Sequence, residues 1–139
     1  MSPGKEVRRV SRSLYVAGPG DAIAVLAGEL GIRPERCLAR GGLNDWDWLA
    51  IEESYLLFCP VGGDFRFAVD VDLFGADWPQ LEARLTALSR QGLVLAVPDE
   101  ESANPFYFLL YENGEKRSVV VMDEDDETDN VRVVGSSRA

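Results

Sequence analysis

Residues 65–73 read Phe65-Arg66-Phe67-Ala68-Val69-Asp70-Val71-Asp72-Leu73, and this stretch decides the fold class. Apolar side chains occupy every second position, and the polar side begins one residue earlier, at Asp64. Successive side chains of a β-strand point to opposite faces, so the alternation predicts a strand with one buried face and one solvent-facing face. Strands of this kind are typical of antiparallel sheets.

Turn signals predict further strands on both sides of this stretch. Gly62-Gly63 is a hairpin dipeptide, and it follows the apolar run Tyr55–Val61. Asn113-Gly114 is a stronger hairpin signal, because both central turn positions need a positive φ. The strands predicted from these patterns cover residues 7–17, 48–61 (as one strand or two), 65–73, 93–97, 106–112 and 116–122, with a last short strand over 131–134.

Two segments carry apolar residues at helical spacing. The first covers about residues 21–30, with the Asp21 carboxylate as its predicted N-cap and Gly31 as its stop. The second begins at Asp77, has a proline in its first turn and ends at Gly92. A shorter helical turn is predicted over residues 34–39.

Before the last short strand, the order β-α-β-β-α-β-β-β places hairpins in succession, without the regular strand–helix alternation of parallel sheets. It predicts an α+β fold in which two helices pack on one face of a mainly antiparallel sheet of about six strands. The length of 139 residues fits one domain, expected over residues 1–139 with flexible ends at 1–6 and 135–139.

The charge balance favours a basic partner. The chain has 14 Lys and Arg against 24 Asp and Glu, a net charge of −10, and residues 99–129 hold eleven acidic and two basic side chains. A negative field repels phosphates and anionic lipids, so we expect neither nucleic-acid nor membrane binding. The same field speeds encounter with a basic protein. That the acidity only keeps the chain in solution remains an alternative.

The sequence contains no histidine, the commonest general base near neutral pH. It also lacks the GxSxG, P-loop and GxGxxG motifs, so we predict no catalytic residue and no cofactor. The two cysteines have no ligand-like spacing; Cys59 is predicted to be a core residue, and a disulfide to Cys37 is left open. No signal peptide or membrane span is visible, so the expected location is the cytoplasm.

Asp70 and Asp72 lie on the same face of the predicted strand. Two carboxylates at this spacing are able to hold Mg²⁺ in a nuclease-like site. Such sites normally recruit a lysine, and the only lysines of the chain are Lys5 and Lys116. The simplest interpretation is the polar face of a half-buried strand, with contact to a partner as the functional one.

The pentapeptide Asn44-Asp45-Trp46-Asp47-Trp48 combines aromatic and acidic side chains. In an extended chain both tryptophans point one way, which predicts two core residues with Asp45 and Asp47 in solvent. The functional alternative is an interface in which Trp46 is the aromatic anchor, since tryptophan is enriched at the energetic centres of interfaces.

Two further segments gather carboxylates. The loop Pro98–Pro105 carries Asp99, Glu100 and Glu101, and loops of this length often take part in recognition. The run Asp123–Asp129 includes Asp123, Asp125 and Asp126 and suggests a calcium loop. An EF-hand needs Gly at position six and Glu at position twelve, where this run has Thr128 and Val134. We therefore predict a solvated loop and no metal site.

Together these features predict a non-enzymatic protein-interaction domain. In general organisation the chain resembles immunity proteins, which implies that it neutralises a basic bacterial toxin, such as a nuclease, by covering its active site. The alternative is a small-ligand or metal-binding module, or an enzyme, that uses Asp70 and Asp72. A homodimer formed through an unpaired sheet edge, such as Val131–Val134, is also open.

Overall fold

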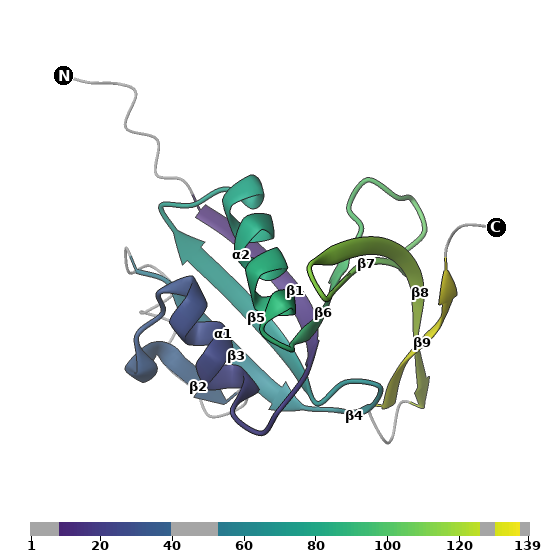
Figure 1. Ribbon diagram of the computed structural model, residues 1–139, viewed down its shortest axis with the longest axis horizontal. Coiled ribbons are helices and arrows are strands. Elements are labelled where there is room, and N and C mark those ends of the chain that lie inside the picture. The colour runs from purple at the N-terminus through teal and green to yellow at the C-terminus, as the bar shows by residue number, and fades with distance from the viewer. Residues whose placement is uncertain (1–8, 40–52, 126–129, 137–139) are drawn as a thin grey trace.

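The computed structural model describes residues 9–39, 53–125 and 130–136, and Figure 1 shows the arrangement of its elements. The helices are α1 (Ala22–Leu30), α2 (Trp78–Arg90) and the single 3-10 turn η1 (Pro34–Arg36). The strands are β1 (Arg9–Ala17), β2 (Cys37–Ala39), β3 (Tyr55–Pro60), β4 (Gly62–Gly63), β5 (Phe67–Phe74), β6 (Val94–Pro98), β7 (Tyr107–Glu112), β8 (Glu115–Asp125) and β9 (Asn130–Ser136).

The strands form one sheet in the order β2-β3-β5-β1-β6-β7-β8-β9-β4. Its pairs are antiparallel except for β2–β3 and β4–β9. The predicted α+β fold with a mainly antiparallel sheet is therefore confirmed. The sheet has more strands than predicted, because β2 and β4, of three and two residues, are too short to leave a pattern of alternation.

The alternating stretch forms β5, which pairs with β1 on one side and β3 on the other. Val69, Val71 and Leu73 are buried on one face, and the residues between them face the other way, as predicted. Phe65 is an exception: it is buried but precedes β5 and packs in a different apolar cluster. The chain turns at this point, where the Arg66 N–H donates to the Val16 carbonyl at 2.8 Å.

Both long helices pack on one face of the sheet, as predicted (Figure 1). Leu26 of α1 and Leu81, Leu85 and Leu88 of α2 are completely buried against the apolar face of the central strands. Burying a leucine side chain contributes about 1.5–3 kcal/mol, so this layer is a main source of stability.

The helix ends follow the predicted signals with one correction. Asp77 accepts from the Gln80 N–H while the Gln80 side chain accepts from the Asp77 N–H, a complete capping box. Gly31 ends α1 with φ 71°. The Asp21 carboxylate, however, makes no capping hydrogen bond. With φ −95° and ψ 20° Asp21 is not extended, and the Ala22 N–H donates to the Pro19 carbonyl instead.

The other half of the sheet, from β6 to β9, curls away from the helices (Figure 1). The curl encloses a second apolar cluster, whose buried members are Phe65, Ala96, Leu110, Val119, Val121 and Val131. Segment β4 closes the curl by pairing with the start of β9. A Cβ atom on Gly63 would lie 2.3 Å from the Val131 carbonyl oxygen, so only glycine permits this approach.

The edge of β9 that the sequence offers for dimerisation is already used within the chain. The Asp64 N–H donates to the Val131 carbonyl at 2.8 Å, and the Val133 N–H donates to the Asp64 carboxylate at 2.9 Å. These two groups of Val131 and Val133 are therefore already bonded within the chain, and a dimer through this edge stays a prediction.

The region around the cysteines also differs from the prediction. The predicted helical turn over residues 34–39 is limited to η1, and Cys37–Ala39 forms β2, because it pairs with β3 in parallel. Cys59 is only half-buried, since β3 places it on the face away from the helices, opposite Ala68. Both cysteines are free thiols.

In the described part of the chain, no helix is long and apolar enough to cross a membrane.

Candidate functional site

The acidic loop between β6 and β7, residues Asp99–Phe106, is held in one shape by its own hydrogen bonds. The Asp99 carboxylate accepts from the Glu101 N–H at 3.1 Å, and the Asn104 side-chain oxygen accepts from the Phe106 N–H at 2.9 Å. The Ser102 hydroxyl accepts from the Asn104 N–H at 3.1 Å. Short polar side chains that bond to backbone amides nearby produce turns of this type. The loop therefore presents its carboxylates from an ordered backbone.

Phe106 lies at the end of this acidic loop with 49% of its surface exposed. Among the described residues, no other large hydrophobic residue is exposed. The Phe106 backbone is fixed, because its carbonyl accepts from the Val121 N–H at 2.9 Å. An exposed aromatic side chain on a loop that also carries carboxylates is a common composition for a protein-binding surface. The sequence pattern predicts a strand that starts at Phe106 and does not reveal the exposure of this residue, although its place directly after Pro105 is a signal for a strand boundary.

A groove of about 520 Å³ separates the acidic loop from the start of α2. Its walls include Trp78 at the first position of α2, Arg12 of β1 and the loop carboxylates. The Arg12 guanidinium lies over the Trp78 ring, 4.9 Å from its centroid, and the Arg12 Nε forms an ion pair with the Glu100 carboxylate at 3.1 Å. We call this space the loop groove.

The far wall of the loop groove contains a second ion pair. Lys116 of β8 donates to Glu82 of α2 at 2.9 Å, and the buried Tyr111 hydroxyl donates to the same oxygen at 2.5 Å. Burial and the hydrogen bond to Glu82 raise the pKa of Tyr111 far above its ordinary value. Partial burial raises the pKa of Glu82, but the hydrogen bonds from Tyr111 and Lys116 outweigh it and hold that pKa below its ordinary value.

Asp70 and Asp72 lie on the face of the sheet away from the helices. Asp70 accepts from the Ser13 hydroxyl at 2.8 Å, and Asp72 accepts from the Ser11 hydroxyl at 2.8 Å and pairs with Arg9. Hollows of about 300 and 360 Å³ flank Asp70. Among the described residues no group of His, Cys, Asp or Glu is arranged to hold a metal ion. The carboxylates are therefore partnered by hydroxyls and a guanidinium across the β1–β5 pair.

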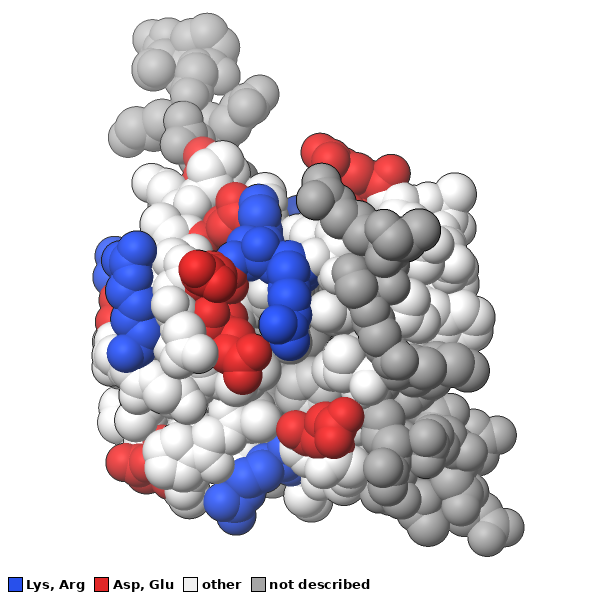
Figure 2. All heavy atoms as spheres, turned by 45° about the vertical axis from the view of Figure 1, so that its right-hand side comes forward, with Lys and Arg blue, Asp and Glu red and all other residues white. Residues whose placement is uncertain are grey.

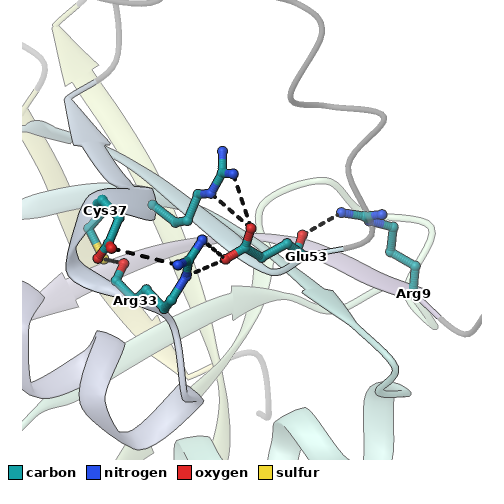
Figure 3. A network of polar contacts seen from close by, with 6 residues as sticks. Arg9, Arg33, Cys37 and Glu53 are labelled. Atoms are coloured by element: carbon teal, nitrogen blue, oxygen red, sulfur yellow. Dashed lines mark hydrogen bonds and ion pairs between the residues drawn. The ribbon is translucent and has the colours of Figure 1, made fainter.

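A polar network that the sequence analysis missed surrounds Glu53, just before β3 (Figure 3). Its carboxylate lies between Arg33 and Arg36, with Arg36 Nη2 at 3.0 Å, and its backbone carbonyl accepts from Arg9 at 2.8 Å. The three arginines come from the start of β1 and from the segment around η1. No local pattern reveals the network, because its members are far apart in the sequence and meet only through the sheet.

The remaining predicted site residues fall in other places. Asp123 and Asp125 lie within strand β8, where they pair with Val131 and Asn130. The loop predicted to begin at Asp123 therefore begins later. Asp45, Trp46, Asp47 and Asp126 lie outside the described residues. The structure thus brings Asp99, Glu100 and Glu101 together in the loop groove and places Asp70 and Asp72 on a different surface.

The charges are interspersed on the surface, although the chain is acidic overall. Figure 2 shows acidic and basic side chains in adjoining strips on one face. The described salt bridges include Arg117 with Glu112 at 3.5 Å and Arg84 with Glu29 at 3.4 Å. The loop groove also holds two ion pairs, Arg12 with Glu100 and Lys116 with Glu82. Its charge is nevertheless unbalanced, because neither Asp99 nor Glu101 forms a salt bridge with a described residue.

No protein-family model, no curated protein and no solved structure matches this chain.

Proposed function

We propose that this chain is a non-enzymatic interaction domain that binds a basic protein through its acidic loop, Asp99–Phe106. In its narrower form the proposal is an immunity protein, acting in the cytoplasm, that neutralises a basic toxin such as a nuclease. The mechanism is occlusion: the loop carboxylates take the positions that substrate phosphates occupy in the toxin, and Phe106 supplies an apolar anchor.

The observation that carries the proposal is the exposed Phe106 at the end of an ordered acidic loop. Preorganisation supports it, because a loop already held in one conformation loses little conformational entropy on binding. The charge pattern supports it too, since Asp99 and Glu101 have no basic partner among the described residues. A partner with a basic surface would satisfy both carboxylates.

The alternative function, ligand or metal chemistry at Asp70 and Asp72, has weaker support. Both carboxylates already accept hydroxyl hydrogen bonds, and Asp72 also pairs with Arg9. A ligand there would have to replace these contacts. Asp70 and Asp72 would serve the interaction domain as a structural polar face.

The experiment is affinity capture from the native host with immobilised wild-type chain, at low and high salt, followed by identification of the captured protein. The purified partner is then titrated against three variants: Phe106→Ala, the triple change Asp99→Asn, Glu100→Gln and Glu101→Gln, and the control Glu115→Gln. Glu115 is also an exposed carboxylate, but it lies on the β7–β8 hairpin.

We expect a basic partner whose affinity falls at least tenfold with Phe106→Ala and with the triple variant, while Glu115→Gln changes little. For the narrower proposal, the partner's enzymatic activity must fall as the complex forms. Equal binding of the partner to the wild type and both loop variants would refute the assignment of this loop.

A further inference from the structure

We propose that the loop groove is the binding site for one arginine side chain of the protein partner. This arginine replaces Arg12 over the Trp78 ring and beside Glu100. The inference rests on the proposed function and specifies its recognition chemistry. It starts from a contact within the chain, because Arg12 already shows how a guanidinium fits between these two groups.

The groove has the chemistry that an arginine requires along its whole length. The Trp78 ring offers a face for the planar guanidinium, as the 4.9 Å approach of Arg12 demonstrates. Glu100 forms an ion pair with the same guanidinium at 3.1 Å. Pro98 and Leu109 line the groove as apolar surface, against which the methylene groups of an arginine pack.

The charge of the groove favours a further cation. Four carboxylates line it, namely Glu82, Asp99, Glu100 and Glu101, against the two cations Arg12 and Lys116. Lys116 is bonded to Glu82 and Arg12 to Glu100. Asp99 and Glu101 remain without a salt bridge to any described residue, so the groove keeps a negative excess beside the Trp78 ring.

Arg12 is poised to give up its place. Its ion pair with Glu100 is open to solvent on the Glu100 side, where the side chain is 59% exposed against 23% for Arg12, and ion pairs that reach solvent contribute little to stability. The further contact that a partner arginine would have to replace is the hydrogen bond from Arg12 Nη1 to the Ser11 carbonyl at 2.8 Å. A partner arginine entering from solvent would reach Glu101 and Asp99 in addition to Glu100 and Trp78. An arginine is favoured over a lysine, because a planar guanidinium stacks on an aromatic ring and bonds a carboxylate with two N–H groups at once.

The test uses argininamide as the probe and lysinamide for comparison, with the Trp78 indole N–H signal followed by NMR. The proteins are the wild type, Arg12→Lys, Arg12→Gln, Glu100→Gln and the control Glu115→Gln. Arg12→Lys is the decisive variant, since it keeps the charge of the groove but removes the guanidinium that stacks on Trp78, pairs with Glu100 and donates to the Ser11 carbonyl.

We expect argininamide to shift the Trp78 signal and to bind at least threefold more tightly to Arg12→Lys than to the wild type. Lysinamide binds more weakly to each protein, Glu100→Gln weakens argininamide binding, and Glu115→Gln leaves it unchanged. Equal affinity for the two probes, or no gain in Arg12→Lys, overturns the arginine-binding site. A failure of this kind leaves partner binding by the acidic loop intact, because that is measured separately with Phe106→Ala and the triple variant.

Discussion

The hydroxyl of Ser89 joins α2 to the tip of the β7–β8 hairpin: it accepts from the Gly114 N–H at 2.8 Å and donates to the Thr86 carbonyl at 2.7 Å. Ser89 is 1% exposed, and no other polar or charged residue is buried among the described residues. Gly114 and Asn113 both have positive φ, so the predicted Asn-Gly turn is confirmed, and the Gly114 N–H of this turn is bonded to α2.

Ser89→Ala removes this contact and leaves the Gly114 N–H without its acceptor. We expect the free energy of unfolding to fall by about 1–3 kcal/mol, the usual cost of an unsatisfied buried donor. Chemical denaturation measures the change. Ala83→Ser, at an exposed position of the same helix, is the control and shifts stability by less than about 0.5 kcal/mol. A loss in Ser89→Ala no larger than in the control would contradict this role.

Tyr111→Phe tests the buried hydrogen bond to Glu82. The pKa of Glu82 is lowered in the folded state, so its stabilisation is present above the ordinary glutamate pKa and is lost as the pH falls through the folded value. We expect Tyr111→Phe to be less stable than the wild type by about 1.5–3 kcal/mol at neutral pH, with a difference that shrinks in acid. Urea titrations at several pH values measure it, and a difference independent of pH would disprove the linkage.

Tyr111 also determines how the free energy of unfolding changes at alkaline pH. Because the pKa of Tyr111 is raised in the folded state, the wild type loses stability as the pH rises above the ordinary tyrosine value of about 10. Tyr111→Phe has no such group at this position. We expect the two unfolding free energies to converge above that pH, as measured by denaturation at alkaline pH. Parallel pH curves would exclude Tyr111 as the cause.

Gly63→Ala tests the closure of the curled half of the sheet. The new Cβ would lie 2.3 Å from the Val131 carbonyl oxygen, on a residue with φ 87°. We expect a loss of more than about 1 kcal/mol in unfolding free energy, from strain and the displaced β4–β9 pairing. Gly28→Ala is the matched control: it lies in α1 with open space around it and is expected to gain about 0.5–1 kcal/mol. Thermal unfolding of both variants distinguishes close approach from a general effect of alanine.

Asn104→Ala separates the shape of the acidic loop from its charge. The change removes the acceptor of the Phe106 N–H and alters no carboxylate. We expect faster hydrogen exchange of the Phe106 amide and a several-fold lower affinity for the basic partner, because the loop must then be ordered on binding. Asn104→Asp keeps the acceptor and protects the amide. Unchanged exchange in Asn104→Ala would show that the loop does not depend on this bond.

The sequence predicts the elements whose signals are local. Alternation places β5, the Asp77 N-cap starts α2, and Asn113-Gly114 sets the β7–β8 hairpin, because each signal acts over a few neighbouring residues. It fails at Cys37–Ala39 and at Phe65. At both positions a distant part of the chain decides the conformation: β3 draws Cys37–Ala39 into a parallel pair, and the curled half of the sheet draws Phe65 out of the β5 face.

The residues of the candidate site were likewise predicted only where the signal is local. By itself the sequence determined that Asp99, Glu100 and Glu101 share a short proline-bounded loop and that Asp70 and Asp72 share a strand face, since both follow from chain geometry over a few residues. Only the tertiary structure decided that Arg12 lies on Trp78 beside Glu100, that Arg33 and Arg36 enclose Glu53, and that β4 covers the edge of β9. These contacts join residues far apart in the chain, and they form because strand order and packing bring their backbones together.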